Sequence, residues 1–133
     1  MARLDTALAG KRILVVEDEF LLALDAAASL EACGAEVVGP AHSIERALAL
    51  AAAETLDAAM LDVNIKGANS LAIALALERR GVPIVYATGY GAKPQDWPAG
   101  PVIDKPYSAE QIGGALATIL AARAERQQAP AAV

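Results

Sequence analysis

The 133-residue chain has little of several residue types, and each shortage excludes a class of protein. Its single cysteine, Cys33, excludes an internal disulfide and a zinc site of clustered cysteines. The 11 Lys and Arg residues are outnumbered by 16 Asp and Glu residues, and the net charge of -5 argues against nucleic-acid binding, which requires clustered cations. No apolar run reaches the length of a membrane span, and residues 1–12 lack the apolar core of a secretory signal. We therefore expect a cytoplasmic protein that binds neither nucleic acid nor membrane.

Apolar residues, in contrast, make up 56% of the chain, which is enough for one domain with its own core. We expect this domain to cover residues 11–124. Residues 1–10 then form an N-terminal extension, and residues 125–133, rich in Ala, Gln and Pro, form a disordered tail. Because this leaves no room for an output module, the chain is either a stand-alone domain or a piece of a longer protein.

Short β-branched runs alternate with longer runs of good helix formers along the whole chain. Such alternation predicts a doubly wound α/β fold, in which a parallel sheet is covered by helices on both faces. The expected strands lie at 12–17, 35–40, 57–63, 82–88 and 101–104, and the expected helices lie at 20–33, 44–54, 71–80 and from 109 onward.

Small polar residues precede three of the expected helices and are their predicted N-terminal caps. These residues are Ser43, either Asn69 or Ser70, and Ser108. The last helix contains adjacent glycines at 113–114, which weaken it unless it packs closely on a neighbour there.

Reactive side chains gather where the expected strands end. In a parallel sheet these carboxyl ends lie along one edge, and ligand-binding and active sites of such folds lie at that edge. The residues at or just after those ends are Glu17, Asp18 and Glu19 for the first strand, Asp62 for the third, Thr88 for the fourth and Lys105 for the fifth. Residues far apart in the sequence are therefore predicted to meet in one site.

Asp62 ends what should be the most buried strand, where an unpaired carboxylate would be costly. Glu17 and Asp18 would repel it unless a cation were present. Mg²⁺ prefers oxygen ligands and commonly bridges carboxylates to a phosphoryl group, so these residues point to phosphoryl transfer. In this interpretation Asp62 is the nucleophile, Lys105 and Mg²⁺ neutralise the transferred group, and Thr88 hydrogen-bonds a phosphoryl oxygen.

Four short motifs also carry a resemblance to a known family. They are "ILVVEDE", "MLDVN", "YATGY" and "DKPY", in that order. Together they resemble the motifs of receiver domains from bacterial two-component response regulators, over about Arg12 to Arg123. The resemblance implies a flavodoxin-like, five-stranded sheet of order 2-1-3-4-5. It also implies a regulator that accepts a phosphoryl group and is not an enzyme with turnover.

The resemblance assigns a role to each residue of the predicted site. It makes Asp62 the phospho-acceptor, and it makes Thr88 and Lys105 the switch hydroxyl and the ammonium that face the phosphoryl group. The Mg²⁺ site that it implies consists of Asp18 as a direct ligand, Glu17 acting largely through water, Asp62, and the backbone carbonyl of Asn64. It further implies a cis bond between Lys105 and Pro106.

The sequence departs from the general receiver pattern between Thr88 and Lys105. Val102 stands where many receivers have the aromatic residue that couples to the switch hydroxyl. The segment 91–101 is rich in Gly and Pro, so we expect the fourth helix to be shortened or replaced by a loop, with Trp97 as its anchor or as a partner contact. The motif "YATGYG" resembles that of the FAT GUY branch of receivers, which is associated with an altered fourth helix and with kinases of the HWE and related types.

Two function classes follow from these observations. In the first, a sensor histidine kinase or a histidine phosphotransfer protein phosphorylates Asp62, which switches a surface for a downstream protein partner around Thr88 and residues 89–101. The donor must be another protein because His42, the only histidine, is interpreted as a surface residue. The alternative is a Mg²⁺-dependent phosphohydrolase of the haloacid dehalogenase type, which needs a second acid where this chain has Asn64. A flavin-binding domain is a distant third, because no phosphate-binding loop follows the first strand.

Overall fold

The computed structural model describes residues 7–89 and 93–128, and its centre is a parallel sheet of order β2-β1-β3-β6-β7. This order confirms the predicted doubly wound, flavodoxin-like fold. The strands of the sheet are β1 (Arg12–Val16), β2 (Glu36–Ala41), β3 (Ala58–Asp62), β6 (Ile84–Thr88) and β7 (Val102–Asp104). The helices are α2 (Phe20–Ala32), α3 (Ile44–Ala53), α4 (Leu71–Arg79) and α5 (Ala109–Gln128), and a small hairpin consists of β4 (Asn64–Ile65) and β5 (Ala68–Asn69).

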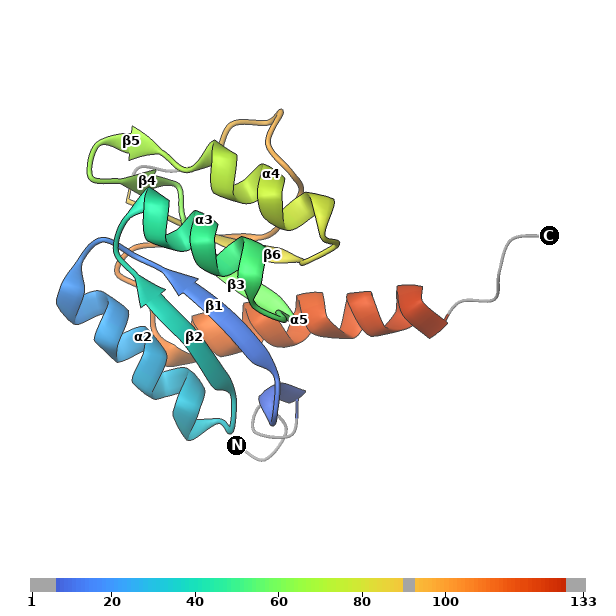
Figure 1. Ribbon diagram of the computed structural model, residues 1–133. Helices are drawn as coiled ribbons and strands as arrows, with labels where there is room; N and C mark the ends of the chain where they lie inside the picture. The colour runs from blue at the N-terminus through green and yellow to red at the C-terminus, as the bar shows by residue number, and fades with distance from the viewer. Residues whose placement is uncertain (1–6, 90–92, 129–133) are drawn as a thin grey trace.

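The helices cover the sheet from both sides, with α2 and α5 on one face and α3 and α4 on the other (Figure 1). Alternate residues of each central strand supply the two faces. In β1, Leu14 and Val16 pack toward α3 and α4, whereas Ile13 and Val15 pack toward α2 and α5. The strands β3 and β6 are buried along their whole length, so their ends are held rigidly by the core.

Two of the predicted caps occur as expected. The Ser43 hydroxyl accepts a hydrogen bond from the Arg46 N–H at 3.2 Å. At the start of α5, the Ser108 hydroxyl accepts from the Gln111 N–H, and the Gln111 side chain accepts from the Ser108 N–H. These reciprocal bonds satisfy backbone donors that a helix leaves without intrahelical partners at its first turn.

Both ends of the domain differ from the sequence prediction. The helix α5 continues to Gln128, so residues 125–128, predicted to be part of a disordered tail, are helical; residues 129–133 lie outside the described residues. Within the predicted extension 1–10, Leu8 is fully buried against the core, and the Gly10 N–H bonds to the Gly34 carbonyl at 2.8 Å. Residues 7–10 therefore belong to the packed domain.

The described residues between β6 and β7 contain no helix, which confirms the loop expected there. The loop is anchored on β6. The Tyr86 hydroxyl donates to the Pro98 carbonyl at 2.7 Å, and the buried Trp97 ring meets the Tyr86 ring edge-on, with centroids 6.1 Å apart. Gly100 lies so close to the strand that a Cβ there would be 2.1 Å from the Ile84 carbonyl oxygen. Trp97 is therefore an anchor of this loop.

Candidate functional site

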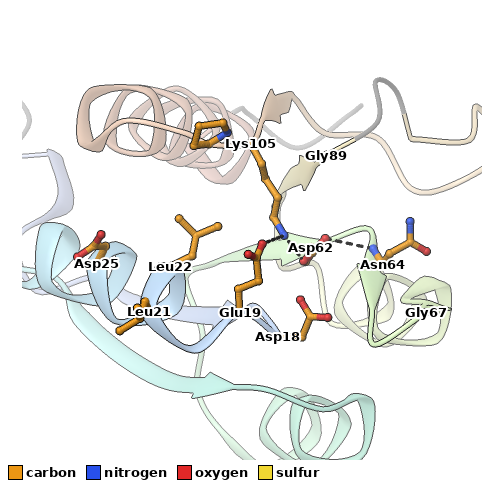
Figure 2. A pocket seen from close by; sticks show the side chains of 11 residues that line it. Asp18, Glu19, Leu21, Leu22, Asp25, Asp62, Asn64, Gly67, Gly89 and Lys105 are labelled. Atoms are coloured by element: carbon orange, nitrogen blue, oxygen red, sulfur yellow. Dashed lines mark hydrogen bonds and ion pairs between the residues drawn. The ribbon is translucent and has the colours of Figure 1, made fainter.

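The carboxyl edge of the sheet holds a pocket of about 670 Å³ (Figure 2). The ends of four strands contribute to this edge, and four residues predicted from the sequence, Glu17, Asp18, Asp62 and Lys105, meet there. Glu17 and Asp18 follow β1, Asp62 ends β3 and Lys105 follows β7. Carboxylate oxygens of Glu17, Asp18 and Asp62 lie within 4.8 Å of one another, and Asp18, Asp62, Asn64 and Lys105 line the pocket.

The Lys105 ammonium is the centre of the site's hydrogen bonding. Its Nζ lies 2.6 Å from Asp62 Oδ2, 3.0 Å from Glu17 Oε2 and 3.2 Å from Glu19 Oε2. Burial on its own would lower the pKa of Lys105, but the bonds to Asp62 and Glu17 outweigh it and raise the pKa above its ordinary value. Lys105 is therefore a permanent cation placed against the expected acceptor.

Glu17 is fully buried and has several hydrogen-bond partners. Its carboxylate accepts bonds from the Lys105 ammonium, the Tyr107 hydroxyl at 3.2 Å and the Glu19 N–H at 3.1 Å. Burial raises the pKa of Glu17 to about 7, although the Glu19 N–H and Lys105 oppose the shift. A carboxyl group in this state gains from an additional cation nearby, since the cation stabilises its charged form.

The other two carboxylates of the cluster have opposite pKa shifts. Burial raises the pKa of Asp62, against the effect of Lys105, and Asp62 Oδ1 accepts a bond from the Asn64 N–H at 3.2 Å. Burial also acts to raise the pKa of Asp18, but the Lys66 N–H, 2.7 Å from Asp18 Oδ2, outweighs it together with Glu17, Lys105 and Asp62, and the net pKa is lowered. Asp18 thus favours its ionised form more than an ordinary carboxyl group does, whereas for Asp62 burial opposes the charged form and Lys105 favours it.

The donor set fits a hard divalent cation. Glu17, Asp18 and Asp62 offer carboxylate oxygens only, which suit Mg²⁺ or Ca²⁺ rather than metals that favour nitrogen or sulfur. Lys105 supplies a single positive charge against these carboxylates and Glu19. A divalent cation would compensate most of the negative charge that remains.

Thr88 occupies the end of β6, next to β3, the strand that ends in Asp62. It is buried, with 4% of its surface exposed. Asp62 is in register with Ala87, so Thr88 lies one residue beyond the partner of Asp62 on the adjacent strand. Its carbonyl also accepts a bond from the Lys105 N–H at 2.9 Å, which couples the ends of β6 and β7.

No family model and no curated protein matches the chain. Among solved structures, it is similar to a response regulator receiver protein from Sinorhizobium medicae WSM419, with 24% identity and a TM-score of 0.76, covering 86% of this chain and 97% of that one. It is similar to SdrG from Sphingomonas melonis Fr1 with 37% identity and a TM-score of 0.73, covering 86% of this chain and 98% of that chain. The chain belongs to the response regulator receiver domains.

A third similar structure is a response regulator from Burkholderia pseudomallei that contains a phosphorylated aspartic acid, a calcium ion and citrate. The identity is 26% and the TM-score 0.73, and the match covers 92% of this receiver domain and 77% of that chain. That likeness is compatible with divalent-metal binding at the acidic cluster described above.

The structure of this receiver domain adds a buried hydroxyl that the sequence interpretation missed. Ser70 is fully buried at the start of α4, but its side chain makes no capping bond. Its Oγ instead lies 2.6 Å from the Asp62 carbonyl oxygen and 3.0 Å from that of Val63. The Asn69 side chain accepts from the Leu71 N–H at 3.1 Å, so Asn69 supplies the side-chain bond at this helix start. Ser70 thus fixes the backbone at Asp62 and Val63.

His42 also differs in part from its interpretation as a surface residue. In this receiver domain its ring is half-buried and lies against Phe20, with ring centroids 5.6 Å apart. Its Nδ1 is 3.0 Å from the Glu17 carbonyl oxygen, a distance that fits donation from an Nδ1–H. His42 therefore supports the backbone at the end of β1.

Proposed function

We propose that this receiver domain accepts a phosphoryl group on Asp62 from a phosphohistidine of another protein, in the presence of Mg²⁺. The observation that carries the proposal is the contact between Asp62 and Lys105, with Nζ 2.6 Å from Oδ2 in a pocket that is open to solvent. An ammonium in that place can neutralise charge on a phosphoryl group as it reaches the carboxylate.

The transfer would proceed as a displacement at phosphorus. A carboxylate oxygen of Asp62 attacks the phosphorus atom and forms an O–P bond while the P–N bond of the donor breaks. The electron pair of that bond stays on the imidazole nitrogen, which then takes a proton from solvent. The Lys105 ammonium moves its hydrogen bond from the carboxylate to a phosphoryl oxygen, so its charge remains paired throughout.

Mg²⁺ is the cofactor in this proposal. Asp18, Asp62 and the backbone carbonyl of Asn64 would hold it, and Glu17 would act on it largely through water. When bound, the ion would stabilise negative charge on the transferring oxygens. The donor set supports this assignment, because the carboxylates of the cluster lie within 4.8 Å of one another.

Signalling would follow from the link between Thr88 and the loop after it. The Thr88 hydroxyl would hydrogen-bond a phosphoryl oxygen on Asp62. Two residues earlier on the same buried strand, Tyr86 holds the loop through Pro98 and Trp97. A shift at the end of β6 would therefore reach the segment 89–101, of which residues 90–92 lie outside the described residues, and a downstream protein partner would bind there.

The proposed role is that of a cytoplasmic regulator and phosphorelay component, not of an enzyme with turnover. Its donor would be a sensor histidine kinase or a histidine phosphotransfer protein. The FAT GUY resemblance of "YATGYG", together with the loop in place of the fourth helix, favours a kinase of the HWE or a related type. No helix among the described residues is long and apolar enough to cross a membrane.

Incubation with a small acyl phosphate and Mg²⁺, followed by intact mass spectrometry, tests the proposal. We expect the wild type to gain one phosphate, and we expect no gain for Asp62→Asn or for the wild type with a chelator. An equal gain in Asp62→Asn would overturn the acceptor assignment. Continuous release of phosphate from simple phosphate esters, with turnover, would favour the phosphohydrolase.

A further inference from the structure

Glu19 holds an unusual position at the start of α2. It is the residue that precedes the helix, where Ser, Asp or Asn side chains commonly accept a bond from the first turn. The Glu19 side chain makes no such bond. Instead it reaches over the pocket, with Oε2 3.2 Å from Lys105 Nζ, and Figure 2 shows it directed at that ammonium.

The three carboxylates on Lys105 are not equivalent. Asp62 and Glu17 are buried, and Glu17 has further bonds from Tyr107 and a backbone N–H. The Glu19 side chain is 65% exposed, and its contact with Lys105 is the longest of the three. A carboxylate that is already in contact with water loses little when it leaves the ammonium, so Glu19 is the partner that Lys105 can release most easily.

An ammonium has three N–H donors, and in this structure a different carboxylate lies within hydrogen-bond distance for each of them. A phosphoryl group on Asp62 presents several charged oxygens to the same ammonium. The contact with Asp62 can pass to one of them, but a second phosphoryl contact requires that another carboxylate give way. Glu17 is fixed by its burial and its other bonds, which leaves Glu19.

We propose that Glu19 is an exchangeable counter-ion, a positioning residue that holds Lys105 in the unphosphorylated state and is displaced by a phosphoryl oxygen. The inference rests on the proposed function, because it needs a phosphoryl group on Asp62. Glu19 thereby sets how strongly Lys105 can bind that group. Removing its carboxylate should strengthen binding of a phosphoryl group at the site.

The chain offers a matched control on the same helix. Asp25 is an exposed acid that lines the same pocket, and no ion pair of Asp25 occurs among residues 7–89 and 93–128. Asp25→Asn and Glu19→Gln remove the same charge from the pocket, but only Glu19→Gln removes an ion pair with Lys105. A long-range charge effect would therefore appear in both variants, whereas displacement would appear in one.

The experiment measures the affinity for beryllofluoride, an unreactive phosphoryl analogue, by calorimetry at saturating Mg²⁺. We expect Glu19→Gln to bind the analogue about threefold more tightly than the wild type, the size of effect typical of an exposed ion pair. Asp25→Asn should stay close to the wild type. Phosphorylation by an acyl phosphate should accelerate in the same order.

A second variant separates this role from a structural one. Glu19→Ser removes the carboxylate and adds a good N-terminal cap, so it should raise the unfolding midpoint and still bind the analogue more tightly. Affinities of Glu19→Gln and Glu19→Ser equal to that of Asp25→Asn would overturn the inference. If the wild type neither binds the analogue nor accepts phosphate, the proposed function fails first, and the two failures are thus distinguishable.

Discussion

The two ends of the parallel sheet use charge in opposite ways. At the amino end, Arg12 forms ion pairs with Glu36 and Glu54 and donates a further bond to the Thr55 carbonyl at 2.7 Å. At the carboxyl end, Lys105 forms ion pairs with three acids, Glu17, Glu19 and Asp62. Arg12 has two acidic ion-pair partners and is joined at that end by Arg80 and Arg123, whereas Lys105 has three acidic ion-pair partners at the carboxyl end.

Other arginines reinforce this contrast. Arg80 donates to the carbonyls of Ala51 and Glu54, and Arg123 donates to the Asp57 carbonyl at 2.6 Å. These arginines donate hydrogen bonds to backbone carbonyls where helices and loops end, and these bonds stabilise the fold. The unmatched acids of the carboxyl end destabilise the metal-free protein but create an attraction for cations. The difference teaches that the carboxyl end is the part of this molecule where acids gather without an equal number of cations, as a site for a cation would require.

The largest effect should come from removing the one cation of the acidic site. In Lys105→Met, phosphorylation by an acyl phosphate should slow by about 100-fold or more, since a preorganised charge opposite the transferring group is lost. Intact mass measured over time gives the rate. Lys66→Met, which removes an exposed lysine beside the site, should leave the rate within about twofold. Equal rates in the two variants would remove Lys105 from the proposal.

The next largest effect should be a pH dependence of the free energy of unfolding, caused by the carboxyl group of Glu17. Its pKa in the folded protein is raised from 4.5 to about 7, so the folded state binds this proton more tightly than the unfolded state does. The resulting stability is complete below the unfolded pKa of 4.5 and is lost as the pH rises through about 7. Denaturant unfolding in chelator should show the wild type losing about 2 kcal/mol relative to Glu17→Gln between about pH 5 and pH 8. Parallel curves for the two proteins would contradict the assignment.

A smaller effect on stability should come from removing the Ser70 hydroxyl, which bonds to the backbone at the site. Ser70→Ala leaves the carbonyls of Asp62 and Val63 without this hydroxyl, and we expect a loss of about 1–2 kcal/mol in the free energy of unfolding. Ser29→Ala, on the half-buried side of α2, is the comparison and should change stability by a few tenths of a kcal/mol. Should the two variants unfold alike, hydrogen bonding would not be what holds the acceptor backbone.

The smallest effect should come from the amino end. Arg12→Ala should reduce the free energy of unfolding by about 1 kcal/mol, because its ion pairs are partly exposed, and the loss should shrink in high salt. The phosphorylation rate should stay within about twofold of the wild type. A large change in that rate would mean that the two ends of the sheet are coupled, and the contrast drawn above would not hold.

Much of the fold was predictable because it depends on local sequence patterns, namely strand runs, helix runs and capping residues. Alternating strand and helix runs gave the layers, and Ser43 and Ser108 marked helix starts correctly. The sequence also indicated which residues meet at the carboxyl edge, since strand ends in a parallel sheet converge. The structure places Glu17, Asp18, Asp62 and Lys105 together there, and their chemical roles remain predictions.

The features that escaped prediction depend on three-dimensional partners. The Ser70 hydroxyl bonds to the Asp62 and Val63 carbonyls across the β4-β5 hairpin, in which Lys66 has φ 52°, an uncommon angle for a residue other than glycine. The contact of Tyr107 with Glu17 joins residues 90 positions apart. The helical end of α5 was missed because chain termini commonly fray, although the residues there are good helix formers.

The anchored loop between β6 and β7 gives the protein a built-in optical reporter. The chain has one tryptophan, Trp97, which belongs to that loop and packs its ring against Tyr86. All tryptophan emission therefore originates at this contact, next to the strand that ends in Thr88. Rearrangement of the loop on phosphorylation would change that emission, so the unlabelled wild-type protein can be followed in a stopped-flow fluorimeter.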